Sequence, residues 1–303
     1  MERMNFKIEV SEEVLKEREK LISELKKNQL VLDFLKKNEC DISLLESYPY
    51  RFKKWLEGLQ ICQKCNGLTQ CKQENKGKVY DLSYNGYLDF ILRSCRYEKK
   101  KKEDEAHLAH IVINDMPSFL YSMTMGKLTI DEDNLQCAKL VMDYLEDPLD
   151  KGFYIQGPVG TGKSTLAAAA CNHFAKKGFR CAFVNVPEWV SRMKGALNDS
   201  DEIQKQIRIL QRVDFLVLDD IGAENTTAWI RDELLFPILN RRMEEKKMTW
   251  FTSNEDWESL YDHYTASGKF KEEEMKAVRI MERVKSLSKI VNLSGKNRRF
   301  LNE

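Results

Sequence analysis

The residues with the clearest chemistry form a phosphate-binding motif in the middle of the chain. Residues 157–164 fit the pattern G-x-x-x-x-G-K-[ST]; they follow an apolar run at 153–156 and open an alanine-rich run at 165–175. Glycines let backbone N–H groups wrap around phosphates, a helix start favours negative charge, and Lys163 supplies a point charge to the β- and γ-phosphates. A glycine-rich turn without a ligand is the alternative, which this strand, loop and helix context disfavours. We therefore predict a nucleotide site with Mg²⁺ held by Ser164, built from Gly157, Pro158, Val159, Gly160, Thr161, Gly162, Lys163 and Ser164.

A pair of acids supplies the carboxylate that such a Mg²⁺ site needs. Asp219 and Asp220 directly follow an apolar run at 215–218, and we expect Asp219 to reach the metal through water. Asp220 stands where many hydrolytic relatives carry a glutamate that orients the attacking water. Its shorter side chain predicts slow turnover, with Glu224 as the fallback base. An acidic pair that only caps a helix is the weaker alternative, because both acids come directly after a buried strand.

A third strand end carries the polar residues Thr252, Ser253 and Asn254. A polar side chain at this place can sense the γ-phosphate or position the attacking water, and we expect Asn254 to do so. Alone, the Ser-Asn pair indicates only a turn. Its weight comes from the order along the chain, in which a phosphate loop, an acid pair and a polar strand end follow one another.

Basic residues gather in the last third of the chain. They form two groups, Arg279, Arg283, Lys285 and Lys289, and then Lys296, Arg298 and Arg299. Arginine stabilises charge on a transferred phosphoryl group, from the same subunit or from a neighbour. A solvated helix face is the simpler reading of the charges alone.

The apolar pattern predicts the elements that must position these residues. An amphipathic helix covers 134–147, and short apolar runs then alternate with helices at 153–156, 181–185, 215–219, 249–253 and 290–293. Continuous apolar strands between helices predict an α/β fold whose parallel sheet is flanked by helices on both faces.

The first third of the chain has a different texture. Residues 11–38 have helical spacing, and one helix face then carries Phe52, Trp55, Leu56 and Leu59, which we interpret as core rather than a partner-binding surface. Residues 62–95 form a loop-rich module, and 97–110 are almost all charged. We therefore expect a small helical N-terminal domain at 1–100, a charged linker at 101–115 and the nucleotide-binding domain at 116–303.

The composition limits the function classes. The 303 residues include 49 Lys plus Arg and 48 Asp plus Glu, so the net charge of +1 excludes a uniformly basic nucleic-acid coat and an acidic solubilising tail. The apolar runs are far too short to cross a bilayer, and the start MERMNFKIEV lacks the apolar core of a signal peptide. We therefore expect a cytoplasmic protein that does not act on a membrane.

Several stretches together resemble a known family: GPVGTGKST, LDDIGAE, WIRDELLFPILNRRM, FTSN, RIMERV and GKNRR. They are similar to the DnaI-type primosomal helicase loaders, AAA+ P-loop ATPases related to the DnaC loader and to IstB-type transposition ATPases. The resemblance implies an AAA+ domain that binds ATP between subunits and engages single-stranded DNA. It also implies an N-terminal domain that grips the hexameric replicative helicase, and self-assembly, because no one subunit holds a complete site.

The resemblance assigns roles to individual residues. Residues 157–165 are the Walker A motif, which adds Thr165 to the nucleotide-binding residues, and Asp219 and Asp220 are the Walker B pair. The remaining roles fall on Asn254 as first sensor, Arg283 as the arginine finger with Arg279 or Arg241 as alternatives, and Arg298 as second sensor with Arg299 close behind.

Half of the eight cysteines predict a structural zinc site: Cys62, Cys65, Cys71 and Cys95. A C-x-x-C turn places two thiolates on one tetrahedral Zn²⁺, and a later pair can close the site. In the resembled family a histidine between the second and last cysteine completes the site, and none of the four histidines here lies in that interval. We therefore expect Cys71 as the fourth ligand, with His107 as an alternative, and unmetallated thiols as the competing interpretation. The cysteines on apolar faces, Cys40, Cys137, Cys171 and Cys181, are expected in the core.

Two other function classes compete with a helicase loader. A metabolic P-loop kinase needs an acceptor pocket and a lid, which nothing in the sequence suggests. An IstB-like transposition helper or replication regulator would use the cysteine module to read nucleic acid; that module has Lys64, Lys72, Lys76 and Lys78 but little aromatic interleaving for base stacking.

Overall fold

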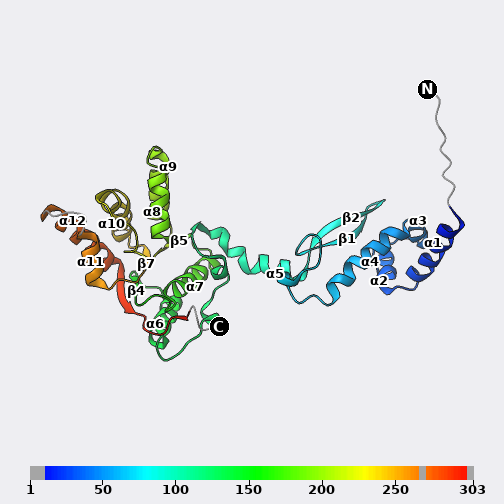
Figure 1. Ribbon diagram of the computed structural model, residues 1–303, viewed down its shortest axis with the longest axis horizontal. Coiled ribbons are helices and arrows are strands. Elements are labelled where there is room, and N and C mark those ends of the chain that lie inside the picture. Colours follow the sequence, from blue (N-terminus) through cyan, green and yellow to red (C-terminus); the bar gives the residue numbers. More distant parts are fainter. Residues whose placement is uncertain (1–10, 266–270, 299–303) are drawn as a thin grey trace, which may run out of the picture. The chain divides into compact units, whose positions relative to one another are not determined.

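The computed structural model of the chain describes residues 11–265 and 271–298. The chain divides into two compact units, Met1–Glu103 and Asp104–Glu303. Figure 1 colours the first unit from blue to cyan and the second from green to red. Each unit has a hydrophobic core of its own.

Short helices and one hairpin build the first unit. They are α1 (Glu12–Leu25), α2 (Gln29–Lys37), α3 (Ile42–Ser47), α4 (Pro49–Gln63), the 3-10 turn η1 (Leu68–Gln70), the antiparallel strands β1 (Lys78–Tyr84) and β2 (Leu88–Ser94), and α5 (Arg96–Glu105) at the boundary. The Phe34 ring lies 5.6 Å from the rings of both Phe52 and Trp55, which confirms the predicted core face of α4. Trp55 Nε1 also donates to Asp81 Oδ1 at 2.7 Å, and this bond joins α4 to β1.

Parallel strands alternating with helices build the second unit. The elements are η2 (Ala106–His110), β3 (Ile111–Asn114), η3 (Ser118–Leu120), η4 (Met125–Lys127), α6 (Leu135–Glu146), β4 (Gly152–Gln156), α7 (Lys163–Lys176), β5 (Cys181–Asn185), α8 (Val186–Gly195), α9 (Ser200–Arg212), β6 (Phe215–Asp219), the π-helix η5 (Ile230–Leu235), α10 (Phe236–Glu244), β7 (Met248–Ser253), α11 (Trp257–Thr265), α12 (Lys271–Leu287) and β8 (Ser288–Asn292).

One six-stranded sheet organises this unit, in the order β3-β5-β6-β7-β4-β8. Every strand pairing in it is parallel, as predicted. The strands β6, β7 and β4 are neighbours, so their carboxyl ends lie at one edge of the sheet. This is the edge at which an open parallel sheet places its ligands.

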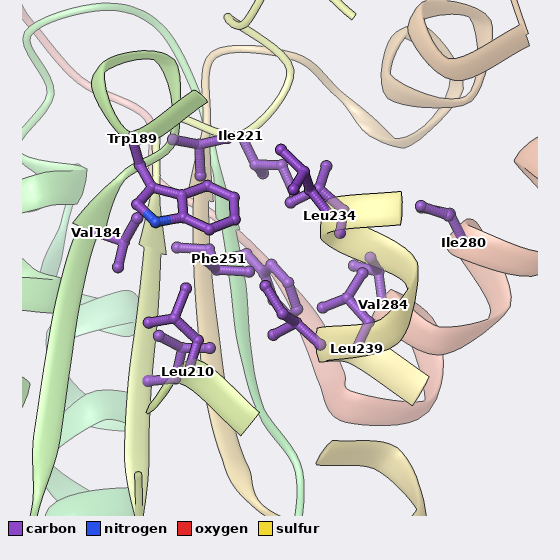
Figure 2. Packing of buried hydrophobic residues seen from close by; sticks show 14 of the residues in the cluster. Val184, Trp189, Leu210, Ile221, Leu234, Leu239, Phe251, Ile280 and Val284 are labelled. Atoms are coloured by element: carbon purple, nitrogen blue, oxygen red, sulfur yellow. The ribbon is translucent and has the colours of Figure 1, made fainter. Parts of the chain in front are cut away.

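Side chains alternate between the two faces of the sheet and feed two cores. On one face Phe153, Phe183 and Phe215 pack with α6 and α7. On the other face the strands pack with α8, α9, α10 and α12, and Figure 2 shows Trp189, Phe251 and Val284 among the side chains that fill this second core. The sheet is therefore covered on both faces, which is why its strands are continuous apolar runs.

The second unit begins earlier than the sequence indicates. Residues 111–114, inside the expected linker, form β3, which pairs with β5 at the edge of the sheet. The charged helix α5 and the short turn η2 precede this four-residue strand, so the sequence pattern around it is that of a linker. Within the described residues no helix is both long and apolar enough to span a membrane.

Candidate nucleotide-binding site

The predicted phosphate loop connects β4 to α7, as the motif requires. Gly160 has a φ of +83° and Gly162 a φ of +103°, in the left-handed region that glycine adopts without strain. A Cβ at Gly157 would collide with the backbone oxygen of Leu293, and one at Gly160 would collide with the Asn297 side chain. The glycines thus allow the tail at 293–298 to lie directly against the loop.

Lys163 is the first residue of α7, and its side chain turns back over the loop. Its Nζ donates to Gly157 O, Pro158 O and Asn254 Oδ1, each at 2.8 Å. Thr161 Oγ1 donates to the same Pro158 O at 3.0 Å, which adds a hydrogen bond within the loop. The ammonium group is therefore placed at the centre of the loop, where a phosphate would need it.

Asp219 ends β6 and is buried beside the loop. Thr252 Oγ1, from the neighbouring strand β7, donates to Asp219 Oδ1 at 2.6 Å. Burial raises the pKa of the Asp219 carboxyl, while hydrogen bonds from Thr252 and Ser164 oppose that rise. A hydroxyl and a carboxylate side by side are the oxygen donors that Mg²⁺ prefers, so Ser164 and Asp219 fit the predicted metal.

Asp220 and Asn254 extend this cluster. Asp220 has a φ of +60°, and its N–H donates to Thr252 Oγ1 at 3.0 Å. Asn254 Nδ2 donates to Asp220 Oδ1 at 2.9 Å, while its own Oδ1 accepts from Lys163. The fold therefore brings together the residues predicted from three strand ends. Thr252 contacts both acids, and its signal in the sequence is a hydroxyl at the end of an apolar strand.

Glu224, the fallback base, is held elsewhere. It is buried, and its two oxygens accept hydrogen bonds from Gly222 N at 2.8 Å, Thr226 Oγ1 at 3.1 Å and Tyr264 OH at 2.9 Å. These contacts tie the loop after β6 to α11. The structure therefore gives Glu224 a bracing position, and Asp220 is the acid next to the Lys163 and Asn254 pair.

Arg283 lies on α12 and contacts other elements. Its guanidinium is 5.1 Å from the centre of the Phe236 ring, its Nε donates to Asn240 Oδ1 at 3.3 Å, and its Nη1 donates to Arg279 O at 3.2 Å. All of these partners belong to α10 or α12. In the described part of the chain, the structure does not bring Arg283 to the phosphate loop of its own subunit.

Arg298 does lie at the loop. Its N–H donates to Gly160 O at 2.9 Å, and its guanidinium pairs with Asp131 and with Thr129 O, before α6. Neither partner belongs to a recognisable motif, although the run of acids before Asn134 is a helix-start signal. Arg299, the other candidate, lies outside the described residues.

The predicted zinc ligands lie in loops and helix ends of the first unit. Gln73 Nε2 donates to Cys62 Sγ at 3.2 Å, and the N–H groups of Gly77 and Glu98 lie 3.5 Å from the Sγ atoms of Cys71 and Cys95. Thiolates accept such bonds, so the chemistry of the donors suits a metal. Among the described residues, however, no three His, Cys, Asp or Glu side chains gather closely enough to hold a metal ion.

The alternative zinc ligand, His107, belongs to the second unit and not to the unit that carries the cysteines. It is buried in the second unit, where its Nε2 lies 3.1 Å from Asn172 Oδ1 of α7. The cysteines outside the predicted zinc set divide as well: Cys137, Cys171 and Cys181 are buried as expected, whereas Cys40 is only half-buried.

Known proteins share both the family and the fold of this chain. Residues 56–302 match the family described as IstB-like ATP binding protein. The chain is 31% identical over 289 residues to the replicative helicase loader DnaI of Bacillus subtilis, covering 93% of each, and 31% identical over 109 residues to the replicative helicase loader DnaC of Escherichia coli, covering 36% of this chain and 44% of that one. A crystal structure of DnaI matches with a TM-score of 0.54 and 30% identity, covering 64% of this chain and 99% of the other. The chain therefore belongs to the IstB-like ATP-binding family, in the group that includes the DnaI helicase loader.

Proposed function

We propose that this chain is an ATP-dependent loader that places a hexameric replicative helicase on single-stranded DNA during primosome assembly, when replication starts or restarts. One observation carries the proposal: the likeness to a replicative helicase loader extends over 93% of both chains, so it includes the N-terminal unit as well as the nucleotide site. Its proposed partners are the helicase, single-stranded DNA and other primosomal proteins. Its proposed place of action is the cytoplasm.

ATP is the proposed substrate of the site around Lys163. The lysine ammonium is positioned among loop oxygens that it can exchange for phosphate oxygens. Mg²⁺, held by Ser164 and through water by Asp219, neutralises phosphate charge when it is bound. Asp220 is the proposed base, and the hydrogen bond from Asn254 fixes its carboxylate. We expect slow hydrolysis in an isolated subunit, because the aspartate side chain is short.

Full ATPase activity is proposed to need more than one copy of the chain. Arg283 contacts α10 and α12 of its own subunit, so a role at a phosphate requires the site of a neighbour. Arginine supplied in trans is a common way to stabilise charge on a transferred phosphoryl group. ATP binding would then favour assembly of the second units.

The first unit is proposed to bind the helicase and to carry a structural zinc ion on Cys62, Cys65, Cys71 and Cys95. The zinc proposal is supported by the C-x-x-C spacing and by the donors directed at Cys62, Cys71 and Cys95. A site with four protein ligands is closed, so the metal would hold the local fold and take no part in catalysis.

Native mass spectrometry of the chain, mixed with the replicative helicase of the same organism, tests the proposed function. The expected result is a defined complex on a helicase hexamer that responds to an ATP analogue, with one zinc ion per copy of this chain. If no complex forms with or without the analogue, the loader function is wrong. The IstB-like transposition helper would then be the leading alternative for this ATPase.

A further inference from the structure

The tail at 293–298 lies against the phosphate loop, and the segment at 129–134 lies against the tail. Leu293 N donates to Gln156 O at 2.8 Å, just before the loop, and Arg298 N donates to Gly160 O at 2.9 Å, within it. Ser294 Oγ donates to Asp133 O at 3.3 Å, which links the tail to the segment before α6. The backbone of Arg298 is therefore hydrogen-bonded to the loop, independently of its side chain.

The guanidinium of Arg298 is held through its two terminal nitrogens. Nη1 donates to Thr129 O at 2.8 Å, and Nη2 donates to Asp131 Oδ2 at 2.6 Å. The Nε atom is buried and has no acceptor among the described residues. It is bonded to Cδ, which lies 4.0 Å from the position of a Cβ on Gly162, the last glycine of the loop. A buried donor without an acceptor is costly, unless a ligand supplies the acceptor.

We propose that Asp131 is a positioning residue of the ATP site. Its carboxylate and the Thr129 carbonyl accept hydrogen bonds from the two terminal nitrogens of the Arg298 guanidinium. These bonds keep the Nε–H of Arg298 beside the phosphate loop, where it can donate to a phosphate oxygen of the nucleotide. The inference rests on the proposed binding of ATP at the loop. It assigns a role to a side chain that belongs to none of the nucleotide-binding motifs.

The two oxygens of Asp131 have separate tasks, which makes the proposal testable. Oδ1 accepts from Asn134 N at 3.2 Å, in the turn that starts α6, and Oδ2 pairs with Arg298. Asp131→Asn keeps an oxygen for the turn but removes the charge that holds the arginine. Asp131→Glu keeps the charge but changes the length of the side chain that makes the turn.

The experiment measures the affinity of the full chain for ATP and ADP by calorimetry, with thermal unfolding of each variant as a folding control. The pair is partly exposed, at 19% and 47% of the two side chains, so we expect Asp131→Asn to weaken ATP binding about three- to five-fold. Asp131→Glu should retain most of the affinity. The matched control is Glu132→Gln, which removes the neighbouring exposed charge and should change nothing.

A double-mutant cycle separates positioning from a structural role. Arg298→Ala should weaken binding about ten-fold, and Asp131→Asn should add no further loss in that background, because its effect passes through the arginine. Equal affinity of Asp131→Asn and wild type, or a loss that adds fully to that of Arg298→Ala, would overturn the proposal. So would a larger loss in Asp131→Glu than in Asp131→Asn, which would indicate the turn instead of the charge. Failure of the wild-type chain to bind ATP would instead overturn the nucleotide site itself.

Discussion

The two predicted sites of this molecule differ in how far the fold assembles them. At the nucleotide site Lys163 contacts Asn254, Asn254 contacts Asp220, and Thr252 contacts Asp219, although these residues are distant in sequence. In the first unit the predicted zinc ligands lie within a short stretch of sequence, at 62–95. There no three of the described ligand side chains meet.

The difference teaches which kind of site a backbone can build by itself. Parallel strands place their carboxyl ends at one edge through backbone hydrogen bonds, so strand order brings Asp219, Asp220 and Asn254 together. A zinc site in a small, loop-rich module has no such frame, and the energy of metal binding is part of the energy that folds it. Closeness in sequence is therefore a poorer guide to assembly than strand order.

The largest expected effect concerns the predicted zinc site of the first unit. Structural zinc contributes roughly 10–16 kcal/mol in small domains, so Cys95→Ser should abolish zinc binding and unfold the cysteine module at 62–95. ATP affinity of the second unit should be unchanged. Metal content and limited proteolysis of the full chain check both results. The control is Cys40→Ser, in the same unit but outside the predicted set; a wild-type chain that folds without zinc would contradict the prediction.

A second prediction asks whether the nucleotide site is complete within one subunit. Arg283→Ala should bind ATP normally but lose about a thousand-fold of the hydrolysis that assembly stimulates, because its contacts direct it away from its own loop. ATP turnover at rising protein concentration measures the loss. Mixing this variant with Lys163→Ala should restore some activity if the arginine acts across subunits. Unaltered stimulation in Arg283→Ala would move the finger to Arg279 or Arg241.

The sequence predicts the positions of the residues that the fold gathers at the phosphate loop, because most of them follow a recognisable strand. The motif at 157–164 and the acids after 215–218 both follow continuous apolar runs. Parallel pairing of these strands with β7 then brings their carboxyl ends together. Residues outside such runs escaped prediction for physical reasons. Asp131 precedes α6 with no strand to mark it, and β3 is a four-residue edge strand behind a charged helix.

Side-chain roles are less predictable than positions. Glu224 follows the acid pair closely enough to suggest a base, but its backbone loop turns it toward Thr226 and Tyr264. His107 is close in sequence to the cysteines, but belongs to the packing of α7 in the second unit. In both cases a tertiary contact, which no local spacing encodes, decides what the side chain does.

A third prediction tests the role of Lys163 in binding the phosphates of ATP. Lys163→Ala should reduce ATP affinity about 100-fold, since it removes charge-assisted hydrogen bonds to phosphate. The proposed binding of the helicase by the first unit should persist, because the described residues of that unit carry no part of this site. Calorimetry with ATP and a helicase pull-down measure the two properties. Lys176→Ala, at the exposed end of the same helix, is the matched control; unchanged ATP affinity in Lys163→Ala would show that the loop is misassigned.

The smallest expected effect concerns the free energy of unfolding, which the buried, charged Asp219 carboxylate lowers when no Mg²⁺ is bound. Burial raises the pKa of Asp219 above its usual value near 3.8, so the folded chain takes up a proton more readily there than the unfolded chain. Stability from this group is present at low pH and is lost as pH rises through the raised pKa. Asp219→Asn removes that loss, so we expect it to stabilise the nucleotide-free chain at neutral pH while it abolishes Mg²⁺-dependent hydrolysis.

Thermal unfolding between pH 4 and pH 8 measures this effect, and its sign has a built-in control. The N–H of Ser259 donates to Asp256 Oδ1 at 2.8 Å and lowers the pKa of that carboxyl, so Asp256→Asn should destabilise the chain at neutral pH. The two substitutions make the same chemical change with opposite expected results. If both substitutions destabilise the chain, the charged Asp219 carboxylate does not lower the free energy of unfolding, and the sheet assembles the nucleotide site at no cost in stability.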